Sequence, residues 1–194
     1  MKKFSKITLS VLLVASAAFT SCSNDDDPAP ATASIYDRLG GTTMVADPDN
    51  PGQQVEKGRL SYRKVVNRTI GLIVADITAG ANGNLQAHFA PLLAETGDTQ
   101  ATNIAELSDN LTDFFSYNTG GTNPVNEYSG LNMVDTHNPA TNPRMGIKAT
   151  NADYTKFEGY IGQAANENGV ASNTKLYTDI VAVLESLRSP IVQN

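Results

Sequence analysis

The spacing of apolar residues constrains the fold of this chain more than any other feature. From Leu60 to Ile77, apolar side chains recur at steps of three and four residues, which places them on one stripe of a helix. Three later segments, 104–115, 157–164 and 176–191, show the same spacing. No segment shows the sustained alternation that is typical of strands, and no repeat is visible. The sequence therefore predicts an all-α domain.

Cap and turn residues indicate where these helices begin and end. Asn103, with Glu106 three positions later, is an N-cap signal for the second helix, and Asn151 can cap the third. Gly120-Gly121 ends the second helix and Gly169 the third, and the fourth begins near Ser172. Residues 41–58 contain two prolines and no periodicity, so we expect an inserted surface loop there.

The N-terminus has the pattern of a secretory signal peptide. Lys2, Lys3 and Lys6 precede an uncharged run, residues 7–18, that is too short to span a bilayer. Small residues and the only cysteine, Cys22, follow. Because one cysteine cannot form an internal disulfide, we expect residues 1–22 to be a lipoprotein signal peptide and Cys22 to be lipidated; an ordinary signal cut nearby is the alternative.

Residues 23–33 are expected to form a flexible tether, since they combine the acidic run 25–27 with prolines and lack apolar periodicity. The acidic run resembles the surface-export signal of some lipoproteins, or it is only a soluble linker. Without residues 1–22 the chain has 194 − 22 = 172 residues and a charge of (14 − 3) − 20 = −9. One domain, residues 34–194, is expected, and its acidity disfavours nucleic acid as a partner.

Two stretches resemble the N-type group of truncated haemoglobins. Residues 34–41, Ser-Ile-Tyr-Asp-Arg-Leu-Gly-Gly, are similar to the opening of that family. The segment from Phe114 to His137 resembles its distal-helix end, glycine turn and proximal-histidine motif, in the same order. The resemblance covers roughly residues 34–192, and it implies a truncated globin-like helical sandwich with two inserted loops.

This resemblance implies that His137 binds the iron of haem b. A porphyrin fills four iron positions, so the protein must supply the fifth ligand and a flat apolar slot. The imidazole must then be neutral at the ligating nitrogen, with its other nitrogen donating to a carbonyl or water. Met133, four residues earlier, would pack on the porphyrin edge. The implied haem contacts are Ile70, Phe89, Leu107, Leu111, Phe114, Phe115, Met133, Ile147, Phe157 and Tyr160.

The chain departs from the family at two places. Ile70 stands where a distal tyrosine is usual and Leu111 where a glutamine is frequent, so we expect no hydrogen-bond donor on the distal side unless Tyr62 or Tyr117 enters the pocket. Oxygen should then be held roughly 10 to 100-fold less well than in relatives that keep a donor. An insertion also follows His137, and its prolines, Pro139 and Pro143, require the helix to end near the ligand.

The sequence thus predicts a haem-binding lipoprotein that reversibly binds a diatomic gas, oxygen, CO or NO. We expect it in the bacterial outer membrane, on the periplasmic or the cell-surface side. The alternative is a haem-free globin-like module for interaction or structure. A peroxidase is disfavoured because a distal histidine or arginine is missing. The other histidine, His88, is expected at the rim, and neither paired carboxylates nor thiols indicate a catalytic site.

Overall fold

Helices account for most of the residues that the computed structural model describes, which are residues 32–194. Within that range 57% of residues are helical and 5% lie in strands, so the predicted, largely α-helical fold is confirmed. The proposed signal peptide, Cys22 and tether residues 23–31 lie outside the described residues. Residues 32–194 form one compact unit, and no helix within it is long and apolar enough to cross a membrane.

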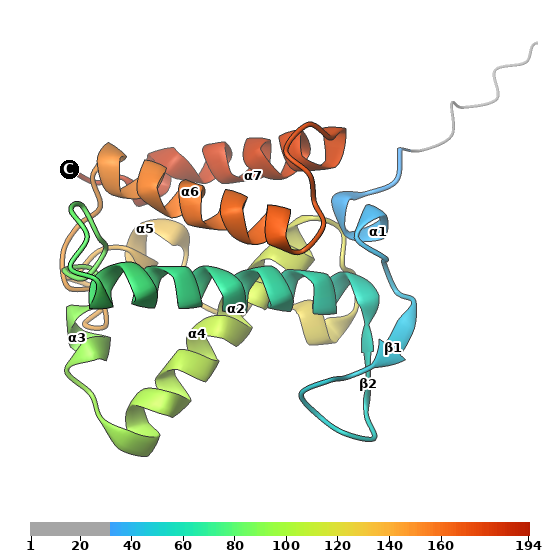
Figure 1. Cartoon of the computed structure of the whole chain (residues 1–194), viewed down its shortest axis with the longest axis horizontal. Helices are drawn as coiled ribbons and strands as arrows, with labels where there is room; N and C mark the ends of the chain where they lie inside the picture. The colour runs from blue at the N-terminus through green and yellow to red at the C-terminus, as the bar shows by residue number, and fades with distance from the viewer. Residues whose placement is uncertain (1–31) are drawn as a thin grey trace, which may run out of the picture. The chain divides into compact units, whose positions relative to one another are not determined.

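Two pairs of longer helices make up the body of this unit. Helix α2 packs against α4 on one side and α6 on the other, and α6 packs against α7 (Figure 1). The elements in chain order are α1 (Ile35–Arg38), β1 (Met44–Ala46), β2 (Gln54–Glu56), α2 (Lys57–Thr78), α3 (Ala90–Leu93), α4 (Gly97–Asn118), the 3-10 helix η1 (Pro124–Asn126), α5 (Met133–Thr136), α6 (Asn151–Glu167) and α7 (Lys175–Ile191).

Helix α2 lies at the centre because its apolar stripe is buried from both sides. Tyr62, Val66 and Ile73 lie on this stripe, and each is at most 6% exposed. Ile73 joins Leu85 and Tyr160 in one core cluster, which links α2 to the segment after it and to α6. The helix that the apolar spacing predicts over 60–77 is therefore confirmed, with three further residues at its start and one at its end.

Three helix starts differ from the expected ones. Helix α4 begins at Gly97 after the N-cap Thr96, six residues before the expected start at Asn103. The Asn103 side chain instead bonds to Glu95 Oε2 at 2.7 Å from inside the helix. The missed first turns are polar and carry no apolar signal. Helix α6 is capped by Thr150 rather than Asn151, through a capping box with Asp153, and α7 begins only after Thr174.

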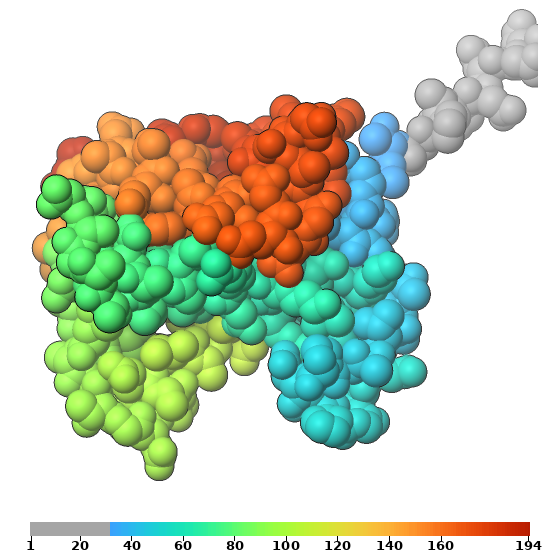
Figure 2. Space-filling view, viewed as in Figure 1, coloured from blue at the N-terminus to red at the C-terminus, as the bar shows by residue number. Residues whose placement is uncertain are grey.

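Residues 41–58 form a hairpin, not the structureless loop that the sequence predicts. Strands β1 and β2 pair antiparallel, with Met44 opposite Glu56 and Ala46 opposite Gln54. Each strand has three residues, which is too short for alternation to be visible in the sequence. The connecting turn is fixed by Asp47, which accepts hydrogen bonds from Asn50 and Arg63. The hairpin and α4 project as separate lobes from the same side of α2 (Figure 2).

A buried polar cluster fastens the start of the domain to the hairpin and to α2. We call Tyr36, Glu56 and Asn126 the N-terminal junction. The Tyr36 hydroxyl donates to Glu56 Oε2, and Asn126 Nδ2 donates to the same carboxylate at 3.1 Å. Tyr36 is fully buried because two glycines let the backbone approach its ring: a Cβ on Gly58 or Gly121 would come within 2.9 Å of it. The Tyr-Asp-Arg-Leu-Gly-Gly opening thus begins a structural anchor.

Candidate haem site around His137

His137 lies at the end of α5, a helix of four residues between η1 and α6. Asn132 caps α5 by accepting a hydrogen bond from the Asp135 amide at 3.0 Å, and His137 is the C-cap residue. The expected end of the helix near His137 is therefore confirmed. His137 Nδ1 lies 2.9 Å from the carbonyl oxygen of Met133, one turn earlier. An N–H on Nδ1 is the only arrangement that makes this contact a hydrogen bond, so the lone pair is on Nε2.

The environment of His137 favours the neutral ring. The side chain is partly buried, and burial lowers the pKa of the imidazole, with a smaller contribution from nearby His88; the bond to the Met133 carbonyl opposes them. Within residues 32–194 no protein group hydrogen bonds to Nε2, and that atom is not among the buried polar atoms without partners. The lowered pKa favours the neutral ring, which is the form that ligates a metal, and Nε2 has no protein partner among residues 32–194.

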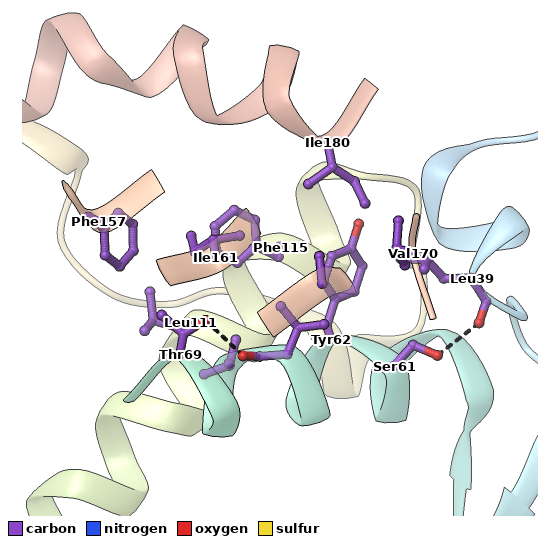
Figure 3. Close-up of a pocket in the computed structure, with 13 residues that line it drawn as sticks. Leu39, Ser61, Tyr62, Thr69, Leu111, Phe115, Phe157, Ile161, Val170 and Ile180 are labelled. Carbon is purple, nitrogen blue, oxygen red and sulfur yellow. Dashed lines mark hydrogen bonds between the residues drawn. The ribbon is translucent and has the colours of Figure 1, made fainter. Parts of the chain in front are cut away.

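An apolar cleft lies between α2, α4, α6 and α7 (Figure 3). Its volume is about 550 Å³ including the part open to solvent, but the centre of a water molecule fits in only about 40 Å³ of it. The cleft is thus too narrow for a porphyrin, and His137 does not line it. The lining residues are Leu39, Ser61, Tyr62, Val65, Val66, Thr69, Leu111, Phe115, Phe157, Ile161, Ala165, Val170 and Ile180.

Of the two tyrosines considered as distal donors, Tyr62 already donates its hydroxyl to another residue and Tyr117 is exposed. Tyr62 reaches the cleft, but its hydroxyl donates to Thr119 Oγ1 at 2.7 Å, and the Thr119 hydroxyl in turn donates to the Phe115 carbonyl oxygen. Tyr117 is 54% exposed. Among the described residues around the cleft, Ser61 and Thr69 also donate to backbone carbonyls. The wall of the cleft therefore offers a ligand mainly apolar contacts.

The structure divides the expected haem contacts into separate groups. Leu111, Phe115 and Phe157 line the cleft, whereas Phe89 and Tyr160 belong with Phe157 to the core cluster around Ile73. Tyr160 also donates to Asp76 Oδ2 at 2.6 Å. The other expected contacts are Met133, which packs on the cluster of Ala149, Tyr154 and Ile191; Phe114, whose ring meets Tyr128; Ile70 and Leu107, which are partly buried; and Ile147, which is 43% exposed.

His88 is buried, so its expected place at the rim is wrong. It is 5% exposed, with Nδ1 3.3 Å from the Ile147 carbonyl oxygen and Nε2 3.3 Å from Asp153 Oδ2. The ring therefore connects the segment before α3 to the start of α6. Sequence reasoning missed this role because both partners lie about 60 residues away. The only signal in the sequence was that His88 lies close to two apolar residues, Leu85 and Phe89.

A second groove is polar and already charge-paired. It lies along α2, and Arg63 and Arg68 on its wall bind Asp47 and Glu167. Paired cations of this kind have little capacity left for an anion. Within residues 32–194 no group of three or more His, Cys, Asp or Glu side chains is placed to hold a bare metal ion.

His137 has the donor atom that a haem ligand needs, an imidazole whose tautomer is fixed by a backbone carbonyl, but the apolar cleft between the helices does not reach it and is too narrow for a porphyrin. The porphyrin supplies the other four donors, so a cluster of protein ligands is not required. Leu111 lines that cleft, and Leu107 and Phe114 lie at helical spacing from it on α4. No known protein family model matches the chain, and no curated protein matches it.

Proposed function

We propose that this chain is a truncated globin-like lipoprotein that binds haem b through His137 and reversibly binds a diatomic gas. One observation carries the proposal: His137 Nδ1 donates to the Met133 carbonyl one turn earlier, at 2.9 Å, and leaves Nε2 without a protein partner within residues 32–194. The resemblance at residues 34–41 and 114–137 supports it, as does the largely helical body in which α2 packs against α4 and α6, and α6 against α7.

Each part of the site has a separate task. His137 provides the nitrogen lone pair, and the Met133 carbonyl fixes the ring orientation and increases the basicity of that nitrogen. Leu107, Leu111 and Phe114 would exclude water from the opposite side. When bound, the haem iron supplies the open coordination position at which oxygen, CO or NO exchanges.

The distal side is predicted to favour ligands that need no hydrogen bond. Ile70, Leu107 and Leu111 have no donor, and the Tyr62 hydroxyl is already bonded to Thr119. A donor to a partly charged ligand contributes roughly 1.5–3 kcal/mol. Its absence disfavours oxygen more than CO, which carries less charge when bound.

The location is part of the same proposal. Lipidation of Cys22 would anchor the domain to the bacterial outer membrane, on its periplasmic or outer side, through the tether that follows. Replacing Cys22 by Ser in the full-length chain should abolish labelling of the protein with a radioactive fatty acid and release it from the membrane fraction. Unchanged labelling would contradict lipidation at this residue.

Haem binding is tested by titrating hemin into residues 23–194 and recording the visible spectrum. The wild-type chain should give a Soret band typical of histidine-ligated haem, and His137→Gly should lose it. Adding free imidazole to His137→Gly should restore the band, because the small ligand replaces the missing ring. Asn118→Ala, on the exposed end of α4, serves as the control and should bind hemin normally. A wild-type chain without a Soret band would favour the haem-free module.

A further inference from the structure

The apolar cleft is elongated, because stripes of two helices line it along their length. Its floor on α2 extends from Ser61 to Thr69, and its wall on α6 extends from Phe157 to Ala165. The two residues of each pair are eight positions apart. A helix rises about 1.5 Å per residue, so both pairs give the cleft a length of about 12 Å.

The cleft is about one atom wide along this length. The centre of a water molecule fits in only about 40 Å³ of it. Spread over about 12 Å, this space admits atoms only in single file. An extended chain of C–C bonds advances about 1.3 Å per carbon, so about ten carbons span the cleft. The shape therefore suits a linear hydrocarbon chain and excludes ring systems.

Water is a poor occupant of this space. Ser61, Tyr62 and Thr69 carry the hydroxyls of the lining, and each already donates to another residue. A buried water needs roughly two to four polar partners, and a space lined by hydrocarbon stays dry. The side chains around a dry space lack van der Waals partners on one side, and a hydrocarbon chain restores those contacts.

One end of the cleft carries a charged cluster with unused hydrogen-bond donors. Leu39 and Ile180 line this end, and their chain neighbours Arg38 and Asp179 form an ion pair at 2.6 Å. Lys175 also bonds to Asp179, at 2.9 Å, so two cations share one carboxylate. A guanidinium has five N–H donors, and Arg38 Nε is buried without a partner in the described part of the chain.

Arg38 also lies close to the lining itself. Burial raises the pKa of the Tyr62 hydroxyl, and the nearby charge of Arg38 is one of the weaker influences that lower it. Figure 3 shows Tyr62 at the same end of the cleft as Leu39 and Val170, with Phe157 at the opposite end. The cleft therefore has one apolar end and one end beside a guanidinium.

We propose that the cleft binds one linear fatty acid of about ten carbons, with its hydrocarbon chain between the helices and its carboxylate at Arg38. A guanidinium binds a carboxylate through parallel N–H donors, and the excess positive charge of the cluster attracts an anion. The site does not include His137, so this inference is independent of haem binding.

The fit of the chain is tested by calorimetric titration of haem-free residues 23–194, which contain the whole compact unit, with fatty acids of increasing length. From hexanoate through octanoate to decanoate, affinity should rise about threefold to fourfold per carbon, because each added methylene is buried. Dodecanoate and tetradecanoate should gain little more. Adamantane carboxylate, whose carbons form a compact cage, should not bind. A series without binding, or equal binding of the cage compound, would overturn the proposal.

The location of the chain is tested by filling the cleft. Ala165 lines it and is 2% exposed, and Ala165→Leu adds three carbons there. Decanoate should then bind roughly 30 to 60-fold more weakly, since about three methylenes are displaced. Ala101→Leu, at an exposed position of α4, is the matched control and should bind decanoate normally. Unchanged binding by Ala165→Leu would place the chain elsewhere and contradict the assignment to this cleft.

A second measurement needs no variant, because an added side chain in a packed core can also destabilise the fold. In the wild-type protein, decanoate should shift the methyl NMR signals of Val65 and Leu111, which line the cleft. The signals of Val74, which is 46% exposed on α2, should stay in place. Shifts confined to exposed methyl groups would also contradict binding in the cleft.

The role of Arg38 is tested by comparing decanoate with decanol, which has the same chain and no charge. Arg38→Gln should weaken decanoate binding about tenfold and leave decanol binding unchanged. Arg68→Gln, which breaks the exposed pair with Glu167, is the matched control and should affect neither ligand. Equal binding of decanoate by Arg38→Gln and wild type, or equal losses for both ligands, would exclude Arg38 as the partner of the carboxylate.

Discussion

The N-terminal junction and the segment around His137 are held together in opposite ways. In the junction, Tyr36 and Asn126 are fully buried and Glu56 is 6% exposed, and all three are joined by hydrogen bonds. Helix α5, by contrast, has four residues and none of them is buried. The junction cannot shift without leaving a buried polar atom unpaired, whereas α5 can open by exchanging a few hydrogen bonds for bonds to water.

The N-terminal junction is therefore the rigid part of the molecule, and α5 is the adjustable part. The junction fixes the hairpin, the start of α2 and the turn after α4 relative to each other, and so fixes the frame in which α4 is placed. The proposed ligand stands on the weaker element, which must move aside if a flat cofactor is to enter. A site on a pliable segment beside a rigid helix is consistent with binding of haem after folding.

The largest effect is expected from Asn126→Ala in the junction. The change removes bonds to Glu56, Tyr36 and Arg59 and leaves a buried carboxylate short of a donor, so unfolding should become easier by about 3 kcal/mol. Urea denaturation measures it. Asn123→Ala is the control, since Asn123 also donates to Glu56 but is exposed, and it should change stability by about 1 kcal/mol or less. Equal effects would mean that burial does not set the strength of the junction.

The next effect is that of Tyr36→Phe, which should reduce stability at neutral pH by about 2 kcal/mol, because a buried bond to a charged acceptor is lost. Burial, together with the bond to Glu56, raises the pKa of Tyr36 to about 12. A raised pKa means that the stabilisation is complete below the unfolded value of about 10 and is lost as pH rises towards 12. The stability difference between wild type and Tyr36→Phe should therefore shrink between pH 10 and pH 12, as followed by denaturation at each pH. A stability difference that stays constant from pH 10 to pH 12 would contradict the raised pKa of Tyr36.

Much of the helical framework could be predicted from the sequence, because apolar residues at helical spacing report which face is buried. The spacing located α2, α6 and α7 to within a few residues. It failed at the start of α4, where residues 97–102 are polar and helical, and at the hairpin, where β1 and β2 are too short for a period. Those elements depend on contacts such as Asp47 with Arg63, which no local pattern reveals.

The site was less accessible to sequence reasoning than the framework. The end of α5 at His137 follows from Pro139, but the bond from its ring to the Met133 carbonyl is a matter of side-chain geometry. The burial of His88 depends on Ile147 and Asp153, which are distant along the chain. The insertion after His137 appears in the sequence only as a departure from a family pattern. Its use as a cap for α5 follows from the bonds of Thr141 and Asn142.

Making the apolar wall of α4 polar at one position should change how long oxygen stays bound. Leu111→Gln places an amide donor on the distal side of the proposed site, where its hydrogen bond to bound oxygen should slow oxygen dissociation by about tenfold, or about 1.4 kcal/mol. Stopped-flow mixing of the oxygenated ferrous, haem-loaded protein with excess CO measures that rate. Leu111→Met, which keeps the wall apolar, should leave it nearly unchanged. A wild-type rate that is already slow would mean that an unassigned donor reaches the ligand.

The smallest effect on the whole molecule is expected from Asn132→Ala, which removes the N-cap of α5. Loss of such a cap destabilises a helix by about 1 kcal/mol, equivalent to roughly fivefold in a local opening equilibrium. Because α5 buries no residue, this opening should stay local: exchange of the amides of residues 133–137 should rise about fivefold, while the midpoint of urea denaturation barely moves. Asn126→Ala should give the reverse pattern, with faster exchange throughout α2 and α4. If Asn132→Ala instead lowers the denaturation midpoint as much as Asn126→Ala does, the ligand segment unfolds only with the frame, and an adjustable site on a rigid support is excluded.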